Sequence, residues 1–175
     1  MAADRGQPAV PLGGAGSMPL VGFGTWQMTG TRCREAVTHA LKVGYRHIDT
    51  ATMYRNEREV GRAIRDSGVP RQEVFVTTKL PPGATGRERR TLDDSLRALG
   101  TDYVDLWLVH WPPRGRALVS TWQELLAVRD AGLAHPRLAR TLLAGCRPPT
   151  RESPRSADER RPDSTAPAVP SPARQ

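Results

Sequence analysis

The segment GYRHIDTATMYRNEREVG, residues 44–61, places a short polar stretch between two predicted helices. Val37, Ala40 and Leu41 recur at helical spacing and predict the buried face of a helix over residues 31–43, directly before the segment. A short strand follows within the segment and ends at Asp49, with Tyr54 on the loop after it. Strands that alternate with helices are the repeating unit of parallel α/β folds. The segment therefore predicts such a fold and puts Asp49 and Tyr54 at the mouth of one strand.

A second helix begins inside the same segment. Asn56, followed three residues later by Glu59, predicts a capping box at the start of this helix. Val60, Ala63 and Ile64 recur at helical spacing and predict its buried face. The polar residues of the segment therefore belong to the loop between the strand and the second helix.

The same rhythm extends in both directions along the chain. The sequence predicts a hairpin over residues 9–26, and the second run of this hairpin continues into a strand near residues 20–24. Further strands are predicted over residues 73–79 and 103–111. One helix is predicted to start at Thr85 and Glu88, and another starts with a capping box of Ser120 and Gln123 and runs to about Ala131. Strict alternation implies parallel strands, in either an open doubly wound sheet or a (β/α)8 barrel. The stretch GFGTWQ, residues 22–27, lacks the third glycine of the dinucleotide-binding loop that would favour the open sheet.

The composition changes near Ala134 and divides the chain into unlike parts. Residues 135–175 contain eight of the sixteen prolines and no Phe, Trp or Tyr. Such a segment buries too little apolar surface to offset its chain entropy, so a disordered tail is predicted there. Residues 1–9 are predicted as a flexible N-terminus, and residues 10–134 as the folded domain.

The formal net charge of +8 does not by itself indicate a nucleic-acid partner. Arginine supplies 24 of the 26 cationic residues, and residues 135–175 alone carry eight arginines against four acidic residues. Nucleic-acid binders usually combine such charge with a recognition module or with aromatic residues that stack on bases. We therefore expect no nucleic-acid partner.

Membrane, disulfide and metal functions are also not indicated. The N-terminus lacks the pattern of a secretory signal, and no apolar run approaches the roughly 18–20 residues that span a membrane. The two cysteines, Cys33 and Cys146, fit neither a disulfide framework nor a metal-ligand spacing. The sequence predicts a cytoplasmic protein with no membrane partner and no metal site.

Chemically capable side chains stand at the predicted carboxyl end of every strand, where parallel α/β folds gather their chemistry. They are Thr25 and Trp26 after the first strand, Asp49 and Tyr54 after the second, Lys79 at the end of the third, and His110 and Trp111 after the fourth. Taken singly, Asp49 could cap a turn, Tyr54 could be a half-buried aromatic residue, and His110 could be a core histidine. Packing explains Lys79 less well, because only one other lysine, Lys42, occurs in this arginine-rich chain.

Together, a phenol, an ammonium, a carboxylate and an imidazole could form an acid site. A phenol is a weak acid at neutral pH, but a nearby ammonium stabilises the phenolate. A carboxylate can hold that ammonium charged and oriented, and an imidazole can orient a carbonyl oxygen beside the phenol. Such a site would protonate a carbonyl oxygen while hydride arrives at the carbon.

The motifs GFGTW, GYRHIDTATMYRNEREVG, FVTTKL and DLWLVHWP, in this order and spacing, resemble the aldo-keto reductase superfamily. The match covers roughly residues 10–134 and resembles the N-terminal half of 2,5-diketo-gluconate reductases and aldose reductases. The resemblance implies a (β/α)8 barrel closed at its bottom by the N-terminal hairpin, with about the first four βα units present. It also implies NADPH-dependent reduction of aldehydes or ketones to alcohols.

The resemblance further implies a role for each strand-end residue. Tyr54 would be the proton donor, and Lys79 and Asp49 would make it more acidic. The substrate-binding residues would be Trp26, His110 and Trp111, with His110 orienting the carbonyl, and the cofactor-binding residues would be Thr25 and Asp49.

After AGLA, residues 131–134, the chain departs from the family pattern. Family members continue with a strand that ends in a Ser-Asn pair and with four more βα units, which supply further contacts to NADPH. We therefore expect a truncated reductase of low activity. The change in composition suggests a reading-frame shift, in which another frame of the same DNA beyond the codon for Ala134 would encode the remaining barrel. The alternatives are a half-barrel completed by dimerisation, and a non-catalytic fragment whose basic tail binds an acidic partner.

Overall fold

A computed structural model of the chain describes residues 7–12, 17–111, 113 and 115–131. Its elements are the strands β1 (Ala9–Pro11), β2 (Ser17–Pro19), β3 (Phe23–Gly24), β4 (His47–Asp49), β5 (Phe75–Leu80) and β6 (Leu106–Val109), the helices α1 (Gly30–Lys42), α2 (Glu57–Asp66), α3 (Glu88–Leu99) and α4 (Arg116–Asp130), and the short 3-10 helices η1 (Thr52–Tyr54) and η2 (Arg71–Glu73). The predicted strands and helices are therefore present, with shifts at their ends. The predictions for residues 1–6 and 135–175 lie outside the described residues.

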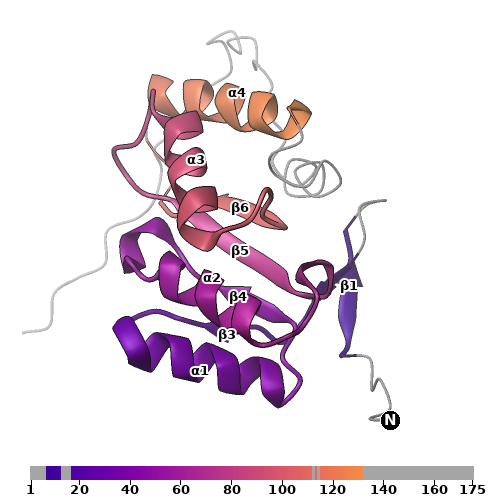
Figure 1. The fold of residues 1–175 in the computed structure, drawn as a ribbon. Helices are drawn as coiled ribbons and strands as arrows, with labels where there is room; N and C mark the ends of the chain where they lie inside the picture. The colour runs from indigo at the N-terminus through magenta and orange to yellow at the C-terminus, as the bar shows by residue number, and fades with distance from the viewer. Residues whose placement is uncertain (1–6, 13–16, 112, 114, 132–175) are drawn as a thin grey trace, which may run out of the picture.

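The central sheet consists of four parallel strands in the order β3-β4-β5-β6, so that each strand pairs with the next along the chain (Figure 1). A doubly wound sheet reverses its strand order at a switch point, whereas a barrel adds strands in chain order. The observed order decides between the two predicted alternatives. The sheet is the first half of a (β/α)8 barrel.

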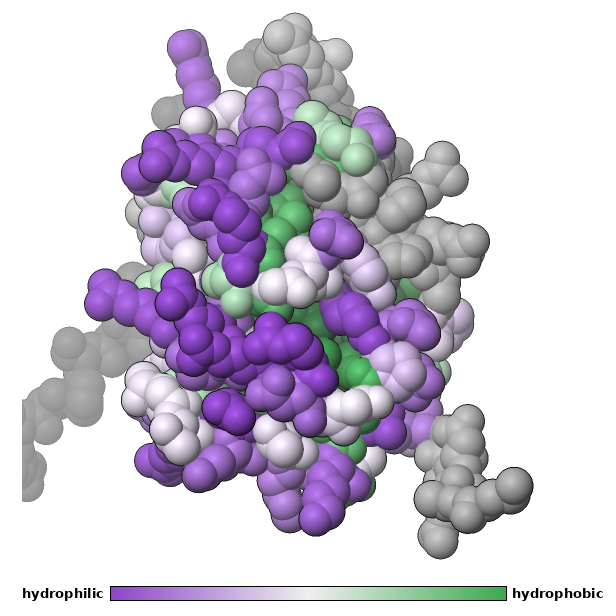
Figure 2. Space-filling view, in the orientation of Figure 1, coloured by the Kyte–Doolittle hydropathy of each residue, from purple (hydrophilic) through white to green (hydrophobic). Residues whose placement is uncertain are grey.

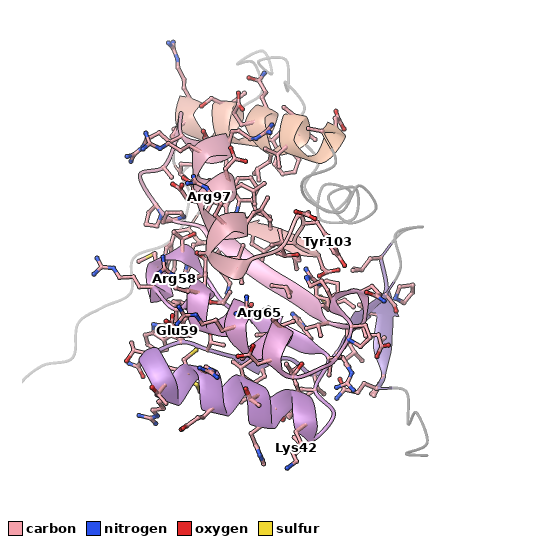
Figure 3. The ribbon with its side chains drawn as sticks, viewed as in Figure 1. Lys42, Arg58, Glu59, Arg65, Arg97 and Tyr103 are labelled. Carbon is pink, nitrogen blue, oxygen red and sulfur yellow. The ribbon has the colours of Figure 1, made fainter. Side chains whose placement is uncertain are left out.

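The helices α1, α2 and α3 cover one face of this sheet (Figure 1). Their buried stripes include the predicted residues Val37, Leu41, Val60, Ala63 and Ile64. Between the helices, Figure 2 shows hydrophobic side chains below a mainly hydrophilic outer surface. Figure 3 shows exposed side chains such as Arg58 and Arg97 on that outer side. The core thus lies between the sheet and the helices, as amphipathic spacing requires.

The N-terminal hairpin β1-β2 packs against the opposite face of the sheet. Leu12 joins Phe75 and Leu106 in a second apolar cluster, together with Met18. Phe75 and Leu106 are the first residues of β5 and β6, so the hairpin covers the amino ends of the strands. This confirms the expectation that the hairpin closes the bottom of the barrel and leaves the carboxyl ends for chemistry. The hairpin begins at Ala9, one residue before the predicted domain boundary, and the division into domains otherwise stays a prediction.

A glycine sets the distance between α2 and α3. A Cβ atom added to Gly61 would lie 2.0 Å from the carbonyl oxygen of Leu99, the last residue of α3. Gly100 then ends α3 with a left-handed φ of 67°, as a C-terminal glycine does. The two helices therefore approach at backbone distance.

The predicted capping boxes are wrong. Asn56 does occupy the N-cap position of α2, but its side chain makes no capping hydrogen bond. The helix predicted to start at Thr85 and Glu88 begins at Glu88, with Arg87 at its N-cap position, and the Thr85 hydroxyl contacts that of Thr121 on α4. Ser120 lies inside α4 and bonds the carbonyl of Ala117 in the preceding turn. In each case a tertiary contact or a longer helix overrides the local signal.

Candidate active site

The carboxyl ends of β4 and β5 bring together the carboxylate of Asp49 and the ammonium of Lys79. The register pairs Asp49 with Thr77, and Lys79 follows two residues later on the same face of β5. Its Nζ atom donates to Oδ1 of Asp49 at 2.5 Å and to the carbonyl oxygen of Thr50 at 3.0 Å. The Lys79 side chain is 13% exposed, and that of Asp49 is 33% exposed. The pair is thus well shielded on the lysine side and open on the carboxylate side.

Tyr54 approaches the same ammonium from the loop after β4. It ends η1, and the next residue, Arg55, adopts a left-handed φ of 55° that turns the chain toward α2. The Nζ atom of Lys79 lies 5.2 Å from the centre of the Tyr54 ring. At this distance a cation is attracted to the ring face. The phenol, the ammonium and the carboxylate therefore lie in one cluster.

His110 completes this cluster from the end of β6. Its ring lies 5.6 Å from that of Tyr54, edge to face, and its backbone N–H donates to the carbonyl of Leu80. Burial lowers the pKa of His110, the positive charge of Lys79 lowers it further, and Asp49 acts in the opposite direction. Its Nδ1 atom is buried and has no hydrogen-bond partner among the residues that the structure describes. The ring is thus held neutral, and a neutral imidazole has one N–H to donate.

Two exposed indoles follow the strands β3 and β6. Trp111 stacks on His110 with ring centres 5.9 Å apart, and it is 63% exposed. Trp26, directly after β3, is 66% exposed. Trp111 thus contacts the cluster through His110, and the lining of a substrate site by Trp26 and Trp111 stays a prediction.

Thr25 makes two hydrogen bonds to the end of β4. It is fully buried, and both its hydroxyl and its backbone N–H donate to the carbonyl oxygen of Asp49, at 3.1 and 2.9 Å. These two hydrogen bonds fix the backbone of Asp49 at the end of β4. Direct contact of Thr25 with a cofactor stays a prediction.

The sequence analysis missed the role of Asn56 in this site. Its side-chain amide donates to the carbonyl oxygens of Thr25 and Met28, at 2.8 and 2.9 Å, and its Oδ1 accepts from the hydroxyl of Thr50 at 2.7 Å. Asn56 is fully buried and is the only asparagine of the chain. One amide therefore ties the loop after β3 to the loop after β4. These three hydrogen bonds require a side chain with two donors and an acceptor, as an amide has. The predicted capping box includes none of these contacts.

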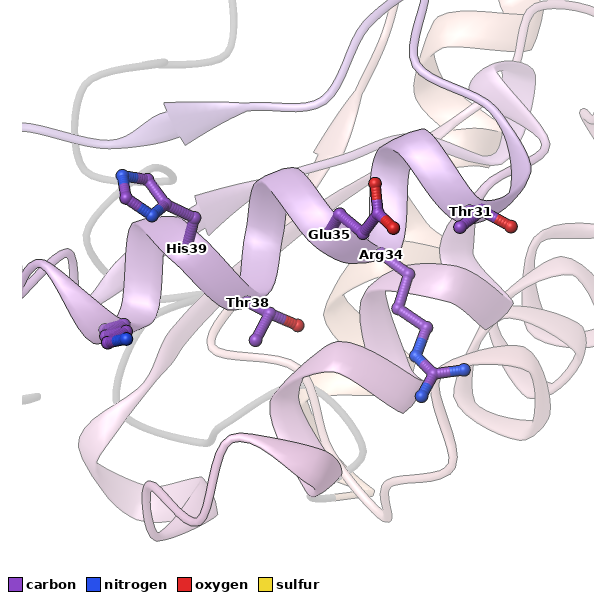
Figure 4. A pocket seen from close by; sticks show the side chains of 6 residues that line it. Thr31, Arg34, Glu35, Thr38 and His39 are labelled. Carbon is purple, nitrogen blue, oxygen red and sulfur yellow. The ribbon is translucent and has the colours of Figure 1, made fainter.

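Two hollows of the described surface lie away from Asp49, Tyr54, Lys79 and His110. One, of about 490 Å³, is lined by side chains of α1 alone, five of which Figure 4 labels. Another, of about 270 Å³, lies between α2, α3 and β5 around Gly61 and Leu99. Neither contains Asp49, Tyr54, Lys79 or His110, so the chemical cluster is recognised by its residues and not by a cavity.

Within the described ranges, no group of three or more His, Cys, Asp or Glu side chains could hold a metal ion. None of the helices that the structure describes is long and apolar enough to cross a membrane. Cys33 is fully buried, and burial raises the pKa of its thiol to about 11, so it is a core residue.

Comparison with known proteins agrees with the geometry. A sequence model of the aldo/keto reductase family matches residues 20–135. The chain belongs to the aldo-keto reductase family. The match includes all seven strand-end residues named from the sequence, so the family resemblance is confirmed.

Relatives within the aldo-keto reductase family are similar over the same region. Glycerol 2-dehydrogenase (NADP(+)) from Saccharomyces cerevisiae is 58% identical over 97 residues, which are 55% of this chain and 31% of that protein. Methylglyoxal reductase DkgA from Yersinia pestis is 44% identical over 128 residues, 73% of this chain and 46% of that protein. The crystal structure of an aldo/keto reductase from Brucella melitensis superposes with a TM-score of 0.70 at 39% identity, covering 79% of this chain and 59% of that one. The chain thus spans less than half the length of both relatives.

Proposed function

We propose that this aldo-keto reductase chain carries the carbonyl-reducing acid site of an NADPH-dependent reductase that converts aldehydes or ketones to alcohols. The observation that carries the proposal is the cluster of Tyr54, Lys79, Asp49 and His110 at the open end of the half-barrel. The relative named for glycerol and NADP(+) and the one named for methylglyoxal support a small carbonyl substrate and the phosphorylated cofactor.

In this proposal Tyr54 donates the proton that the carbonyl oxygen gains. The ammonium of Lys79 stabilises the negative charge that remains on the phenol oxygen, because opposite charges favour the ionised form of an acid. Asp49 holds this ammonium through the 2.5 Å hydrogen bond. His110, kept neutral by its surroundings, donates a hydrogen bond to the carbonyl oxygen and orients it toward Tyr54. The flanking Trp26 and Trp111 shield the substrate from water.

The described residues fit only the reacting end of a nicotinamide cofactor. Such a cofactor, when bound, supplies the hydride that the carbonyl carbon gains. The carboxylate of Asp49 is one-third exposed and engages Lys79 through Oδ1, so its open side suits the polar groups next to the nicotinamide. Thr25 is fully buried and fits less well. The preference for NADPH over NADH rests on the family resemblance and on the printed name of one relative.

The test is the oxidation of NADPH by the purified chain with small aldehydes and ketones, measured beside Tyr54→Phe. Tyr45→Phe is the matched control, because the ring of this tyrosine contacts that of Phe23 and lies outside the cluster. Turnover that falls about 10²–10⁴-fold in Tyr54→Phe and not in Tyr45→Phe supports the proposal. Absence of turnover in a folded preparation overturns it and favours the non-catalytic alternative.

A further inference from the structure

The loop that carries Tyr54 is bonded to β5, the strand that carries Lys79, through a side chain that the proposed mechanism does not use. The hydroxyl of Thr52, the first residue of η1, donates to the backbone carbonyl of Lys79 with an Oγ1–O distance of 3.0 Å. Tyr54 ends the same short helix, and its N–H donates to the carbonyl of Ala51 at 2.9 Å. Lys79 is therefore bonded at its backbone to the turn that holds Tyr54, as well as at its ammonium to Asp49.

This contact takes the place of a backbone hydrogen bond that β4 would make if it were longer. In a parallel pair, the N–H groups of every second residue bond every second carbonyl of the neighbouring strand. The N–H of Thr50 donates to the carbonyl of Thr77 at 2.9 Å. The next pair in this series is the N–H of Thr52 and the carbonyl of Lys79. Because β4 has already ended at Asp49 and the chain turns into η1, the hydroxyl of Thr52 supplies the donor instead. A residue without a hydroxyl group would leave this carbonyl without that donor.

The turn η1 has little stability of its own. It is a single turn of 3-10 helix, whose hydrogen-bond geometry is poorer than that of an α-helix. None of its three residues is buried, and the side chain of its N-cap residue, Ala51, makes no capping hydrogen bond. The residue after it, Arg55, adopts a left-handed φ of 55°, which costs energy in a residue other than glycine. Hydrogen bonds to neighbouring segments therefore decide where this turn lies.

Helix α3 contacts the same hydroxyl of Thr52. Ser95 is 1% exposed, and its Oγ atom lies 3.3 Å from Oγ1 of Thr52. Thr52 is half-buried, and as a β-branched residue it has few χ1 rotamers. Its hydroxyl is therefore confined between α3 and the end of β5, as suits a group that fixes the position of a turn.

The last two carbonyls of β5 hold the segments on both sides of Lys79. The carbonyl of Lys79 accepts from Thr52 toward β4, and the carbonyl of Leu80 accepts from the N–H of His110 at 3.0 Å toward β6. Consecutive carbonyls of a strand point to opposite neighbours, so one strand end serves both segments. The end of β5 thus fixes where Tyr54 and His110 stand relative to the ammonium that it also carries.

We propose that Thr52 is a positioning residue, which sets the distance between the Tyr54 ring and the Lys79 ammonium by bonding η1 to the Lys79 carbonyl. Its effect on carbonyl reduction rests on the proposed function, whereas the placement of the ring does not. Only one residue separates Thr52 from Tyr54, so a shift of η1 away from β5 moves the ring from its position 5.2 Å from the ammonium. Thr52 acts through Tyr54 and is not itself a catalytic residue.

Nuclear magnetic resonance of labelled lysine tests this placement without reference to activity. The chain has two lysines, so isotope-labelled lysine gives two sets of side-chain signals, and the exposed Lys42 of α1 serves as an internal control. Nuclei over the face of an aromatic ring are shifted upfield, and Tyr54→Leu gives the position of the Lys79 signals without the ring. Thr52→Val should move the Lys79 signals toward this position, while Thr52→Ser should keep them near those of the parent. Lys79 signals that are unchanged in Thr52→Val overturn the inference.

Two further comparisons separate the hydrogen bond from packing. Thr91→Val on α3 is the matched control, because it removes a hydroxyl that donates to the carbonyl of Arg87, and it should leave both sets of lysine signals in place. Thr52→Ala beside Thr52→Ser repeats the test with smaller side chains, should the valine variant not fold. Lys79 signals that move equally in the alanine and serine variants overturn the hydrogen bond as the cause.

Kinetics test the catalytic consequence. In Thr52→Val we expect kcat to fall roughly 10–100-fold with little change in KM, because a small misplacement of a reacting group slows the chemical step more than it weakens binding. Thr52→Ser should keep most of kcat, and Thr91→Val should keep all of it. A kcat in Thr52→Val equal to that in Thr52→Ser overturns the positioning role. If the parent itself does not turn over, the proposed function fails, and the lysine signals still decide the placement of Tyr54.

Discussion

The ammonium of Lys79 lies 5.2 Å from the centre of the Tyr54 ring while it donates to Asp49 on the neighbouring strand. One cation thus serves two partners that come from different segments of the chain. Its position is fixed by the register of β4 and β5 and by the carbonyl of Thr50, which accepts from the same Nζ atom. The chemistry of the site depends on this placement more than on the presence of a positive charge.

Lys79→Arg should therefore abolish most of the carbonyl reduction although the charge is kept. A planar guanidinium is larger than an ammonium and cannot reach Asp49 and the Thr50 carbonyl with one atom beside Tyr54. We expect kcat to fall about 10²–10⁴-fold, measured by NADPH oxidation. Lys42→Arg, at the exposed end of α1, changes the other lysine of the chain and should leave kcat unchanged. Activity retained in Lys79→Arg would contradict the assigned role.

Asn56→Asp distinguishes the observed contacts from the capping box. Asparagine and aspartate are equally good N-caps, so a capping role predicts little change in stability. In the structure, the carboxylate would replace a donating amide that faces the carbonyls of Thr25 and Met28. We expect a loss of about 3 kcal/mol in the free energy of unfolding, measured with urea, because two buried acceptors lose their donor. Unchanged stability would show that the capping interpretation holds in solution.

Gly61→Ala should destabilise the protein although alanine is the better helix former. The added methyl group would lie 2.0 Å from the carbonyl oxygen of Leu99, so α2 and α3 must move apart. This overpacking costs about 1–3 kcal/mol or more, against a gain of about 1 kcal/mol in helix propensity. Gly24→Ala is the control, since its new methyl group meets nothing within 4 Å. Equal midpoints of urea unfolding for both variants would contradict the close approach.

His47 should make the protein less stable as the pH falls. Its ring contacts the carbonyl of Pro19 at 3.2 Å and the hydroxyl of Thr77 at 3.0 Å, and burial is the largest cause of its lowered pKa. A histidine with a lowered folded pKa binds its proton more readily when unfolded, so its stabilising effect is complete above pH 6.5 and is lost as the pH falls toward the folded value.

The measurement for His47 is the midpoint of thermal unfolding between pH 8 and pH 5. We expect His47→Gln to reduce the dependence of this midpoint on pH. His39→Gln, on the exposed side of α1, is the matched control and should keep it. The same slope in His47→Gln and in the parent would exclude His47 as the titrating group.

The sequence predicted the elements and the strand-end residues well because both depend on local patterns. Helical spacing identified Val37 and Val60 as core residues, and the strand ends identified Asp49, Tyr54, Lys79 and His110. These patterns alone left the barrel and the open sheet undecided. The pairing of each strand with its successor settles that choice, and pairing is not a property of any single segment.

The side-chain partners were predicted less well because they depend on tertiary contacts. Asn56 has the sequence pattern of an N-cap, yet its amide binds two carbonyls of the preceding loop. Thr25 stands at a strand end but turns its hydroxyl toward the backbone of Asp49. Glu57 has the pattern of a solvated first-turn residue and is instead buried against Thr78. A short-range motif cannot tell which neighbour from a distant segment will satisfy a polar group.

Strand pairing in chain order also bears on how the polypeptide assembles during synthesis. Domains generally fold from the N-terminus as the chain leaves the ribosome, and contacts between nearby segments form fastest. β4 can pair with β3, β5 with β4 and β6 with β5 as each strand is synthesised, so each new strand adds to the open edge of the sheet formed before it. The hairpin is the exception, because Leu12 must wait for Phe75 and Leu106. The hairpin therefore precedes the sheet in the sequence but can complete its packing only after β5 and β6 have been made.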